Sequence, residues 1–352
     1  MMSLAAGLTA TVLAFPAEPL TENATAIAVK HRPMQIARTD PLARGESSEA
    51  RSGGGNSRTP DRGTNTAPQA PAAMVDDRAD DAAPPLPKSR ISLGALDVWD
   101  TGLCEMSFYQ AVDVIYGKPR HYTRVHLLNR QWMDGDSGVK TERTAPGAMP
   151  VFKLNMAEEI PTENYHYRYL TTLFVDRIEL KPMKMIVSSQ EWCGATFKHL
   201  RWGDDTLMVR SFSYFPDEGD RSWVVPHPSQ TVLPFESLFI IARDAAASQS
   251  PRSIKLLPPM RSNHQVQPVV IDARLELADA GTFTVPAGTF AATRVTLEWD
   301  GPETNFVVER APPYRLLSYK VGERFGRLIG TERRAYWNQS SPSRFHAPLE
   351  AP

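Results

Sequence analysis

The sequence predicts a mainly β protein, with one large antiparallel sheet that is strongly curved or forms an open β-barrel, and one amphipathic helix. Roughly a dozen short runs alternate apolar and polar residues, as strands do when one face is buried. Tight-turn pairs such as Asp300-Gly301 and Gly322-Glu323 separate several of these runs. Only one segment carries apolar residues at helical spacing, and no internal repeat has a fixed period, which disfavours a propeller.

The strands follow one another along the chain as hairpins. Residues 103–116 alternate well, Gly117-Lys118-Pro119 predicts a turn, and residues 122–128 return as the second strand. A later turn is also predicted to be structural, because Pro286 restricts φ and Gly288 permits a positive φ. The other predicted strands are residues 150–156, 165–174, 174–180, 184–190, 196–202, 206–215, 269–277, 281–285, 289–299, 305–309, 314–321 and 327–337.

One segment, residues 233–247, is predicted to form the helix. It contains no glycine, and Pro234 suits the first helical turn. Apolar residues at helical spacing predict that one face packs on the core while the other meets water. These apolar positions are Phe235, Leu238, Phe239 and Ala242.

The composition divides the 352-residue chain into four predicted parts. We expect a signal peptide over residues 1–28, a disordered linker over 29–92, a β-rich domain over 93–337 and a disordered tail over 338–352. The linker has few large apolar side chains, so it cannot bury enough surface to offset its ordering entropy. The β-rich part contains enough aromatic and aliphatic residues for one sizeable core.

The first residues predict export. Leu4–Phe15 has the length and apolar character of the central region of a signal peptide, and Ala24-Thr25-Ala26 and Ala26-Ile27-Ala28 are candidate cleavage sites. The first basic residue is Lys30, and a start codon assigned too late would explain the lack of an earlier one. The alternative is a cytoplasmic tail with a chance apolar patch. We therefore expect a periplasmic or secreted protein.

Charge and motifs exclude several function classes. The formal net charge of −1 argues against a nucleic-acid partner. No apolar run approaches the ~20 residues that a transmembrane helix needs. The histidines are scattered without metal-ligand spacing, and the chain has no phosphate loop, nucleophile elbow or dinucleotide fingerprint. We therefore expect no metal and no cofactor.

Two short tracts supply candidate ligand-binding residues. The first is a stripe of three tyrosines on one face of a predicted strand, which either lines a pocket for an apolar or sugar-like ligand or packs half-buried in the sheet. The second places an amide, a carboxylate and an indole before Cys193-Gly194. Its alternative is an ordinary strand end, with Trp192 filling the barrel interior and Glu191 paired with an arginine. The candidates are Tyr165, Tyr167, Tyr169, Gln190, Glu191 and Trp192.

The two cysteines leave two alternatives open. Cys104 and Cys193 either form one disulfide, worth about 4–5 kcal/mol for so long a loop, or remain two small buried thiols. A nucleophilic Cys193 would need a nearby base such as His199. On an extended strand these two residues would lie roughly 20 Å apart, so only a fold at Gly194 would bring them together. We therefore expect no catalytic residue.

Several tracts resemble a known family. Thr282–Phe290, followed by Thr293-Arg294-Val295 and Pro313–Tyr319, resembles domain-of-unknown-function family 3108, exported β-rich bacterial proteins with a Val-Pro-Ala-Gly turn. Ser188–Gly194 is similar to a motif of related uncharacterised bacterial proteins. The resemblance spans residues 93–337 but is specific only in those tracts. It implies a cell-envelope location and an open barrel or curved sheet, and it implies no catalytic residues.

Three function classes remain. The one we favour is a non-catalytic binding or carrier module for an apolar or glycan-like ligand on the concave side of the sheet. The second is a structural or interaction protein of the envelope, and the third is a hydrolase that uses Cys193 or Glu191. A large apolar cavity would favour the first, and a filled interior with exposed edge strands the second. A low pKa for Cys193 beside a histidine would favour the third.

Overall fold

The computed structural model describes residues 91–227 and 230–338, together with Ser343 and Phe345. These residues all fall within one of the two compact units of the chain, residues 68–352. The expected signal peptide (1–28), almost all of the expected linker (29–92) and most of the expected tail (338–352) lie outside the described residues.

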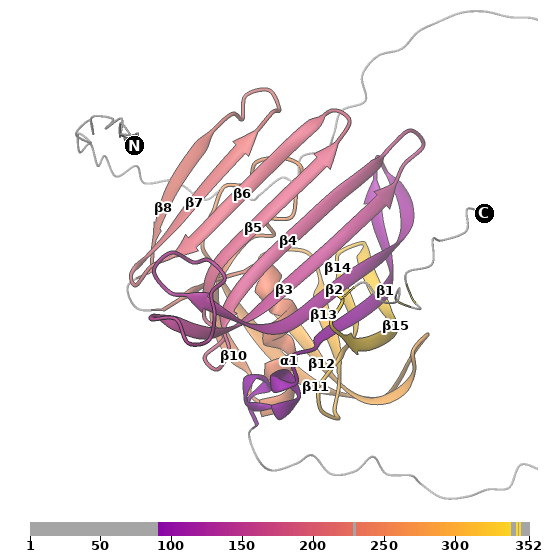
Figure 1. Cartoon of the computed structure of the whole chain (residues 1–352). Helices are drawn as coiled ribbons and strands as arrows, with labels where there is room; N and C mark the ends of the chain where they lie inside the picture. Colours follow the sequence, from indigo (N-terminus) through magenta and orange to yellow (C-terminus); the bar gives the residue numbers. More distant parts are fainter. Residues whose placement is uncertain (1–90, 228–229, 339–342, 344, 346–352) are drawn as a thin grey trace, which may run out of the picture. The chain divides into compact units, whose positions relative to one another are not determined.

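The described chain is built on one 15-stranded sheet with strand order β8-β7-β6-β5-β4-β3-β2-β1-β15-β14-β13-β12-β11-β10-β9 (Figure 1). Neighbouring strands are antiparallel except β9 and β10, which are parallel, and the sheet does not close because β8 and β9 are its two edges. The prediction of a mainly β protein with a large curved sheet is confirmed. The strands are β1 Cys104–Ile115, β2 Lys118–Asp134, β3 Ala148–Pro161, β4 His166–Asp176, β5 Pro182–Glu191, β6 Gly194–Trp202, β7 Thr206–Ser213, β8 Arg221–Pro226, β9 Val232–Pro234, β10 Arg252–Leu257, β11 Ile271–Val285, β12 Gly288–Trp299, β13 Thr304–Glu309, β14 Leu316–Val321 and β15 Arg324–Arg334.

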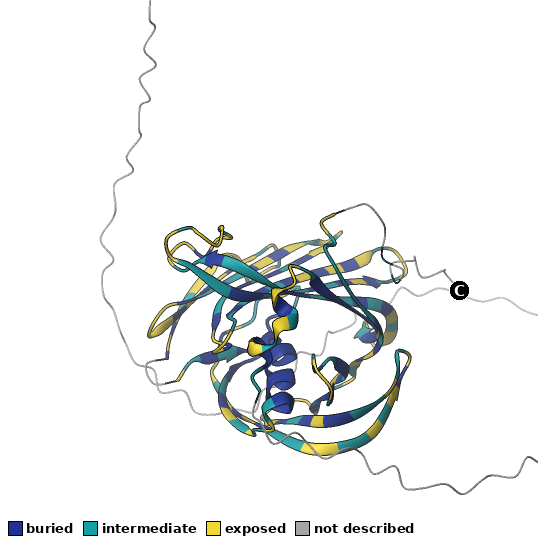
Figure 2. Ribbon diagram, turned by 60° about the horizontal axis from the view of Figure 1, so that its bottom comes forward, coloured by how far each residue is buried: buried dark blue, intermediate teal, exposed yellow. Residues whose placement is uncertain are grey.

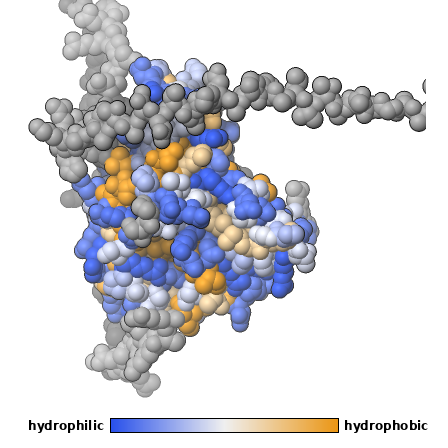
Figure 3. Space-filling model, turned by 90° about the vertical axis from the view of Figure 1, so that its left-hand side faces the viewer, coloured by the Kyte–Doolittle hydropathy of each residue, from blue (hydrophilic) through white to orange (hydrophobic). Residues whose placement is uncertain are grey.

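Alternation of side chains gives the sheet a buried inner face and an exposed outer face (Figure 2). In β4, Tyr167, Tyr169 and Thr171 are buried, whereas Arg168 and Leu170 between them are exposed. The surface seen from the side of β8 mixes hydrophilic and apolar side chains (Figure 3). The outer face is not uniformly polar, because Leu170, Phe197 and Met208 are exposed on it.

Tight turns join most neighbouring strands. Tyr116 and Gly117 both have positive φ between β1 and β2, as a two-residue hairpin turn requires. Between β11 and β12, Val285 pairs with Gly288, whose φ is +135°, so that Pro286 and Ala287 form the turn. These turns carry the chain directly from one strand to its neighbour.

The strand boundaries differ from the sequence prediction in several places. The expected strand at 174–180 is wrong, because the carboxylate of Asp176 accepts hydrogen bonds from the backbone N–H groups of Ile178 and Glu179, at 2.8 and 2.6 Å, and closes a turn. The two expected strands at 269–277 and 281–285 are one strand, β11, with an irregularity between Asp279 and Gly281. Strands β8, β9 and β10 were not predicted.

The helix α1, Leu238–Ser248, lies on the concave side of the sheet and is buried all round (Figure 2). Pro234 belongs to β9, and a short 3-10 helix, η3 (Phe235–Ser237), precedes α1. The expectation of a water-facing side is wrong, because its charged residues are buried in ion pairs. Arg243 contacts both carboxylate oxygens of Glu105, at 2.7 and 3.2 Å.

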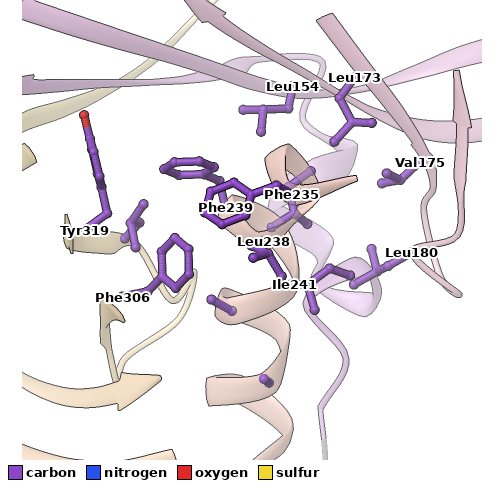
Figure 4. Close-up of a cluster of buried hydrophobic side chains, with 14 of the residues drawn as sticks. Leu154, Leu173, Val175, Leu180, Phe235, Leu238, Phe239, Ile241, Phe306 and Tyr319 are labelled. Carbon is purple, nitrogen blue, oxygen red and sulfur yellow. The ribbon is translucent and has the colours of Figure 1, made fainter. Parts of the chain in front are cut away.

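Side chains fill the concave side around α1. Leu154 of β3 and Leu173 of β4 point toward the helix from one side, and Phe306 of β13 approaches from another (Figure 4). The ring of Phe239 lies edge-on to Phe306 and Tyr319, with centroids 5.5 and 5.3 Å away. A core of this kind is held by close packing, so α1 occupies the space that a ligand would need.

Two further 3-10 helices, η1 (Leu93–Ala95) and η2 (Asp97–Asp100), precede β1 and add buried Leu93 and Trp99 to the core. In the part of the chain described, no helix combines the length and the apolar character needed to cross a membrane.

Candidate functional site

Five of the six predicted ligand-binding residues meet where β4 begins and β5 ends. Glu191 pairs with Gly194, so Trp192 and Cys193 form the turn between β5 and β6. The indole of Trp192 is 80% exposed and stacks on the ring of Tyr165, with centroids 5.6 Å apart and planes 22° apart. The alternative in which Trp192 fills the interior is wrong, because a turn residue projects from the end of the sheet.

The aromatic row, defined as Trp192, Tyr165, Tyr167 and Tyr169, continues from this turn along β4. Successive tyrosine rings lie 5.5 Å and 6.4 Å apart. The hydroxyl group of Tyr116, from the turn between β1 and β2, forms a short hydrogen bond with that of Tyr167. The row passes from exposed Trp192 to Tyr169, which is buried.

Polar groups lie beside the exposed end of the aromatic row. The amide of Asn263 donates a 2.7 Å hydrogen bond to Glu191, and the hydroxyl of Tyr165 lies 3.5 Å from the same carboxylate. Gln190 lies on the outer face of β5 and does not join this group. Asn263, which was not predicted from the sequence, reaches the site from the segment between β10 and β11.

A buried ion cluster lies at the inner end of the aromatic row. The guanidinium group of Arg261 lies 4.0 Å from the ring centroid of Tyr169 and pairs with Asp113 at 2.7 Å and Glu158 at 2.9 Å. Tyr122 donates a 2.7 Å hydrogen bond to Glu158, and Arg124 lies 3.8 Å from it. These residues were not predicted from the sequence, although Asp113 and Glu158 occupy buried, inward positions where strand alternation favours apolar side chains.

The arginines decide the charge state of Glu158. Burial by itself raises its pKa, but Arg124 and Arg261 and the hydrogen bond from Tyr122 hold that pKa at about 2. Glu236 behaves in the opposite way, since burial raises its pKa above the usual value. One of its carboxylate oxygens accepts the backbone N–H groups of Met260 and Arg261, at 2.7 and 2.9 Å.

A small cavity adjoins this cluster. Its volume of about 20 Å³ suits about one water molecule. An acyl chain or a sugar ring would not fit there without rearrangement of the core. The cavity is lined by Tyr122, Arg124, Glu158, Phe235, Glu236, Phe239, Pro259, Arg261, Tyr319, Val321 and Arg324.

The two cysteines are free thiols, so the Cys104–Cys193 disulfide is wrong. Cys104 begins β1, whereas Cys193 lies in the turn between β5 and β6, and β2, β3 and β4 separate the two in the sheet. The alternative of two buried thiols holds for Cys104 alone, since Cys193 is exposed. Burial raises the pKa of Cys104 to about 12, which keeps it protonated and unreactive.

The geometry does not assemble a cysteine nucleophile. The sulfur of Cys193 lies 3.5 Å from the hydroxyl of Tyr165. Strand β6 runs on from Gly194 without folding back, so His199 stays on its outer face and pairs across the sheet with Ile186 and Arg210. Among the described residues, no group of three or more His, Cys, Asp or Glu side chains is placed to hold a metal ion.

Comparisons with known proteins give one structural likeness. No family model matches the chain, and no curated protein matches it. The chain is similar to a crystal structure of a β-barrel-like protein of domain-of-unknown-function family 1849 from Brucella abortus, with 10% identity and a TM-score of 0.40. The match covers 66% of this chain and 98% of that one.

Proposed function

We propose that the protein is a non-catalytic binding module for a glycan-like ligand, which it holds at the exposed end of the aromatic row. The observation that carries the proposal is the position of Trp192, whose indole is 80% exposed yet held in place by stacking on Tyr165. The apolar face of a sugar ring packs against such a flat aromatic surface. Glu191 and Asn263 beside it supply groups for hydrogen bonds with hydroxyls.

The filled interior favours a glycan over a lipid as the ligand. An apolar chain would need a large dry cavity, but α1 occupies the concave side and the cavity beside the ion cluster measures only about 20 Å³. A sugar needs no such cavity, since it binds at the surface with one face stacked and its hydroxyls in contact with polar groups. The carrier role for an apolar group is therefore the weaker form of the proposal.

We also propose that the protein works in the cell envelope, as a periplasmic or secreted protein. Support comes from the signal-like residues 1–28 and from the resemblance of Thr282–Phe290 to exported proteins of family 3108. The hydrolase alternative has less support, because β6 carries His199 away from Cys193.

Isothermal titration calorimetry with defined oligosaccharides tests the proposal. The full chain is titrated with chitohexaose, cellohexaose, maltohexaose and isomaltohexaose. We expect saturable binding of at least one of them, weakened about tenfold by Trp192→Ala, since an aromatic contact contributes about 0.5–1.5 kcal/mol beyond area burial. The control is Trp337→Ala, which removes an exposed tryptophan outside the aromatic row. Binding that Trp192→Ala leaves unchanged, or no binding of any of the four, would contradict the proposal.

A further inference from the structure

The outer face of β4–β8 carries exposed apolar side chains in register with one another. Leu170, Phe197 and Phe212 occupy one row, in which Ser188 lies between Leu170 and Phe197. A second row places Met208 beside Val224, which is 67% exposed. Large apolar side chains are therefore exposed on four strands of one face, β4, β6, β7 and β8.

Basic side chains lie between these two apolar rows and next to them. Ile186, His199 and Arg210 form the middle row. The next row runs from Lys184 through Arg201 to Met208. The outward positions of β5–β8 contain no Asp or Glu. The face therefore combines apolar and cationic side chains without carboxylates on the same four strands.

Most of this positive charge lacks an acidic partner within the face. Arg201 and Lys184 donate hydrogen bonds to backbone carbonyl groups of the loop after β2, those of Gly135, Asp136 and Gly138. Burial and then the neighbouring Lys184, Arg210 and Arg201 lower the pKa of His199, as expected where positive charges gather. On β4, in contrast, Arg168 pairs with Glu159 of β3.

An aromatic residue lies at one end of the face. Tyr214 directly follows β7 and is 71% exposed, and its ring packs against Gly194, where an added Cβ would lie 2.3 Å from it. Figure 3, which views the molecule from the side of β8, shows apolar side chains grouped among hydrophilic ones. Tyrosine is enriched where proteins meet the headgroup layer of a membrane.

We propose that the outer face of β4–β8 binds the surface of an anionic phospholipid bilayer. Charge complementarity identifies the partner, since the outward positions of β5–β8 carry arginine and lysine but no carboxylate, and such a face attracts anionic headgroups. The exposed Phe197, Phe212 and Val224 account for the apolar half of the contact, because an interfacial surface inserts such side chains just below the headgroups. An anionic bilayer, which offers both charged headgroups and an apolar layer beneath them, therefore matches the whole face. This membrane binding is independent of glycan binding at Trp192.

Vesicle co-sedimentation of the full chain tests the proposal. The probes are vesicles of phosphatidylcholine alone and vesicles with equal parts phosphatidylglycerol and phosphatidylcholine. We expect binding to the anionic vesicles only, with a marked loss in 0.5 M salt because salt screens surface charge (about a 3–5 Å Debye length at that strength). Each basic side chain near the surface contributes about fivefold in affinity, so Arg210→Glu should weaken binding more than tenfold.

Control variants elsewhere on the protein show whether a loss of vesicle binding is specific to the outer face of β4–β8 or follows from any change of charge or hydrophobicity. Arg294→Glu reverses an exposed arginine on β12, and Phe325→Ser removes an exposed phenylalanine on β15. We expect Arg210→Glu and Phe212→Ser to lose vesicle binding while these two controls keep it, with all four variants showing wild-type circular dichroism. Equal losses in variants and controls would overturn the proposal. Absence of vesicle binding would also overturn it, and salt-sensitive capture on polyglutamate would then assign the face to an acidic protein.

Discussion

The ring of Trp192 lies 5.6 Å from the ring of Tyr165 and nearly parallel to it, although the two residues come from different strand ends. Tyr165 precedes β4, and Trp192 forms the turn between β5 and β6. Stacking on Tyr165 restrains an indole that would otherwise lose rotamer freedom when a ligand binds. A preorganised aromatic surface binds at a lower entropic cost, which is why this pair is central to the proposed function.

The ion cluster makes a prediction about stability. Glu158→Gln leaves Arg124 and Arg261 buried with a weaker partner, and breaking a buried ion pair costs about 3–5 kcal/mol. Urea denaturation measures this loss. Glu159→Gln is the matched control, because the neighbouring carboxylate forms an exposed pair with Arg168 and should cost at most about 1 kcal/mol. Equal losses in the two variants would show that the cluster does not stabilise the fold.

The carboxylate of Glu158 also predicts how the free energy of unfolding depends on pH. The pKa of Glu158 is lowered from 4.5 to about 2 in the folded protein, so its stabilising contribution is complete above pH 4.5 and is lost as the pH falls toward 2. The wild type should therefore lose about 3 kcal/mol more than Glu158→Gln over this range. Unfolding free energies of both proteins between pH 6 and about 2.5 test this. Parallel curves would contradict the assigned pKa.

The two thiols should differ in reactivity. Cys193 is exposed, whereas Cys104 is buried with its pKa raised to about 12 by burial. Since the chain has two cysteines, Ellman's reagent should titrate one thiol in the native protein and two in urea without reductant. No thiol in urea would instead show a disulfide.

The close packing around α1 predicts that a cavity created there would lower the free energy of unfolding by a large amount. Phe239 contacts both Phe306 and Tyr319 and is buried, so Phe239→Ala should destabilise the protein by about 3–5 kcal/mol. Phe325→Ala, at an exposed position of β15, should cost well below 1 kcal/mol. Thermal and urea unfolding measure both. A small loss for Phe239→Ala would mean that the concave side is less tightly packed than the structure indicates.

Local patterns predicted much of the fold. Alternation over residues 103–116 and 122–128 anticipated β1 and β2, and the same period of two placed Tyr165, Tyr167 and Tyr169 together. The positions of β1 and β2 and the shared face of the three tyrosines depend only on residues that are close together in the sequence. The strand alternation of period two is therefore sufficient to find them.

Local spacing of apolar and polar residues cannot predict contacts between segments that are far apart in the sequence. Glu158 meets Tyr122 across 36 residues and Arg261 across 103 residues, so no local spacing marks the ion cluster. The spacing of apolar residues predicted a water-facing side for α1. Ion pairs of Arg243 with Glu105 and of Asp244 with Arg252 allow these charged residues to be buried instead. Trp192 was expected inside in one alternative, because large aromatic residues are usually buried and its turn position was not recognised.

A crystal structure of the protein with a bound oligosaccharide would show where the ligand binds. We expect a sugar ring stacked on the exposed face of Trp192, with hydroxyl groups within hydrogen-bond distance of Glu191 and Asn263. A ligand found on the concave side, in an enlarged form of the cavity beside Arg124 and Arg261, would contradict the proposed function.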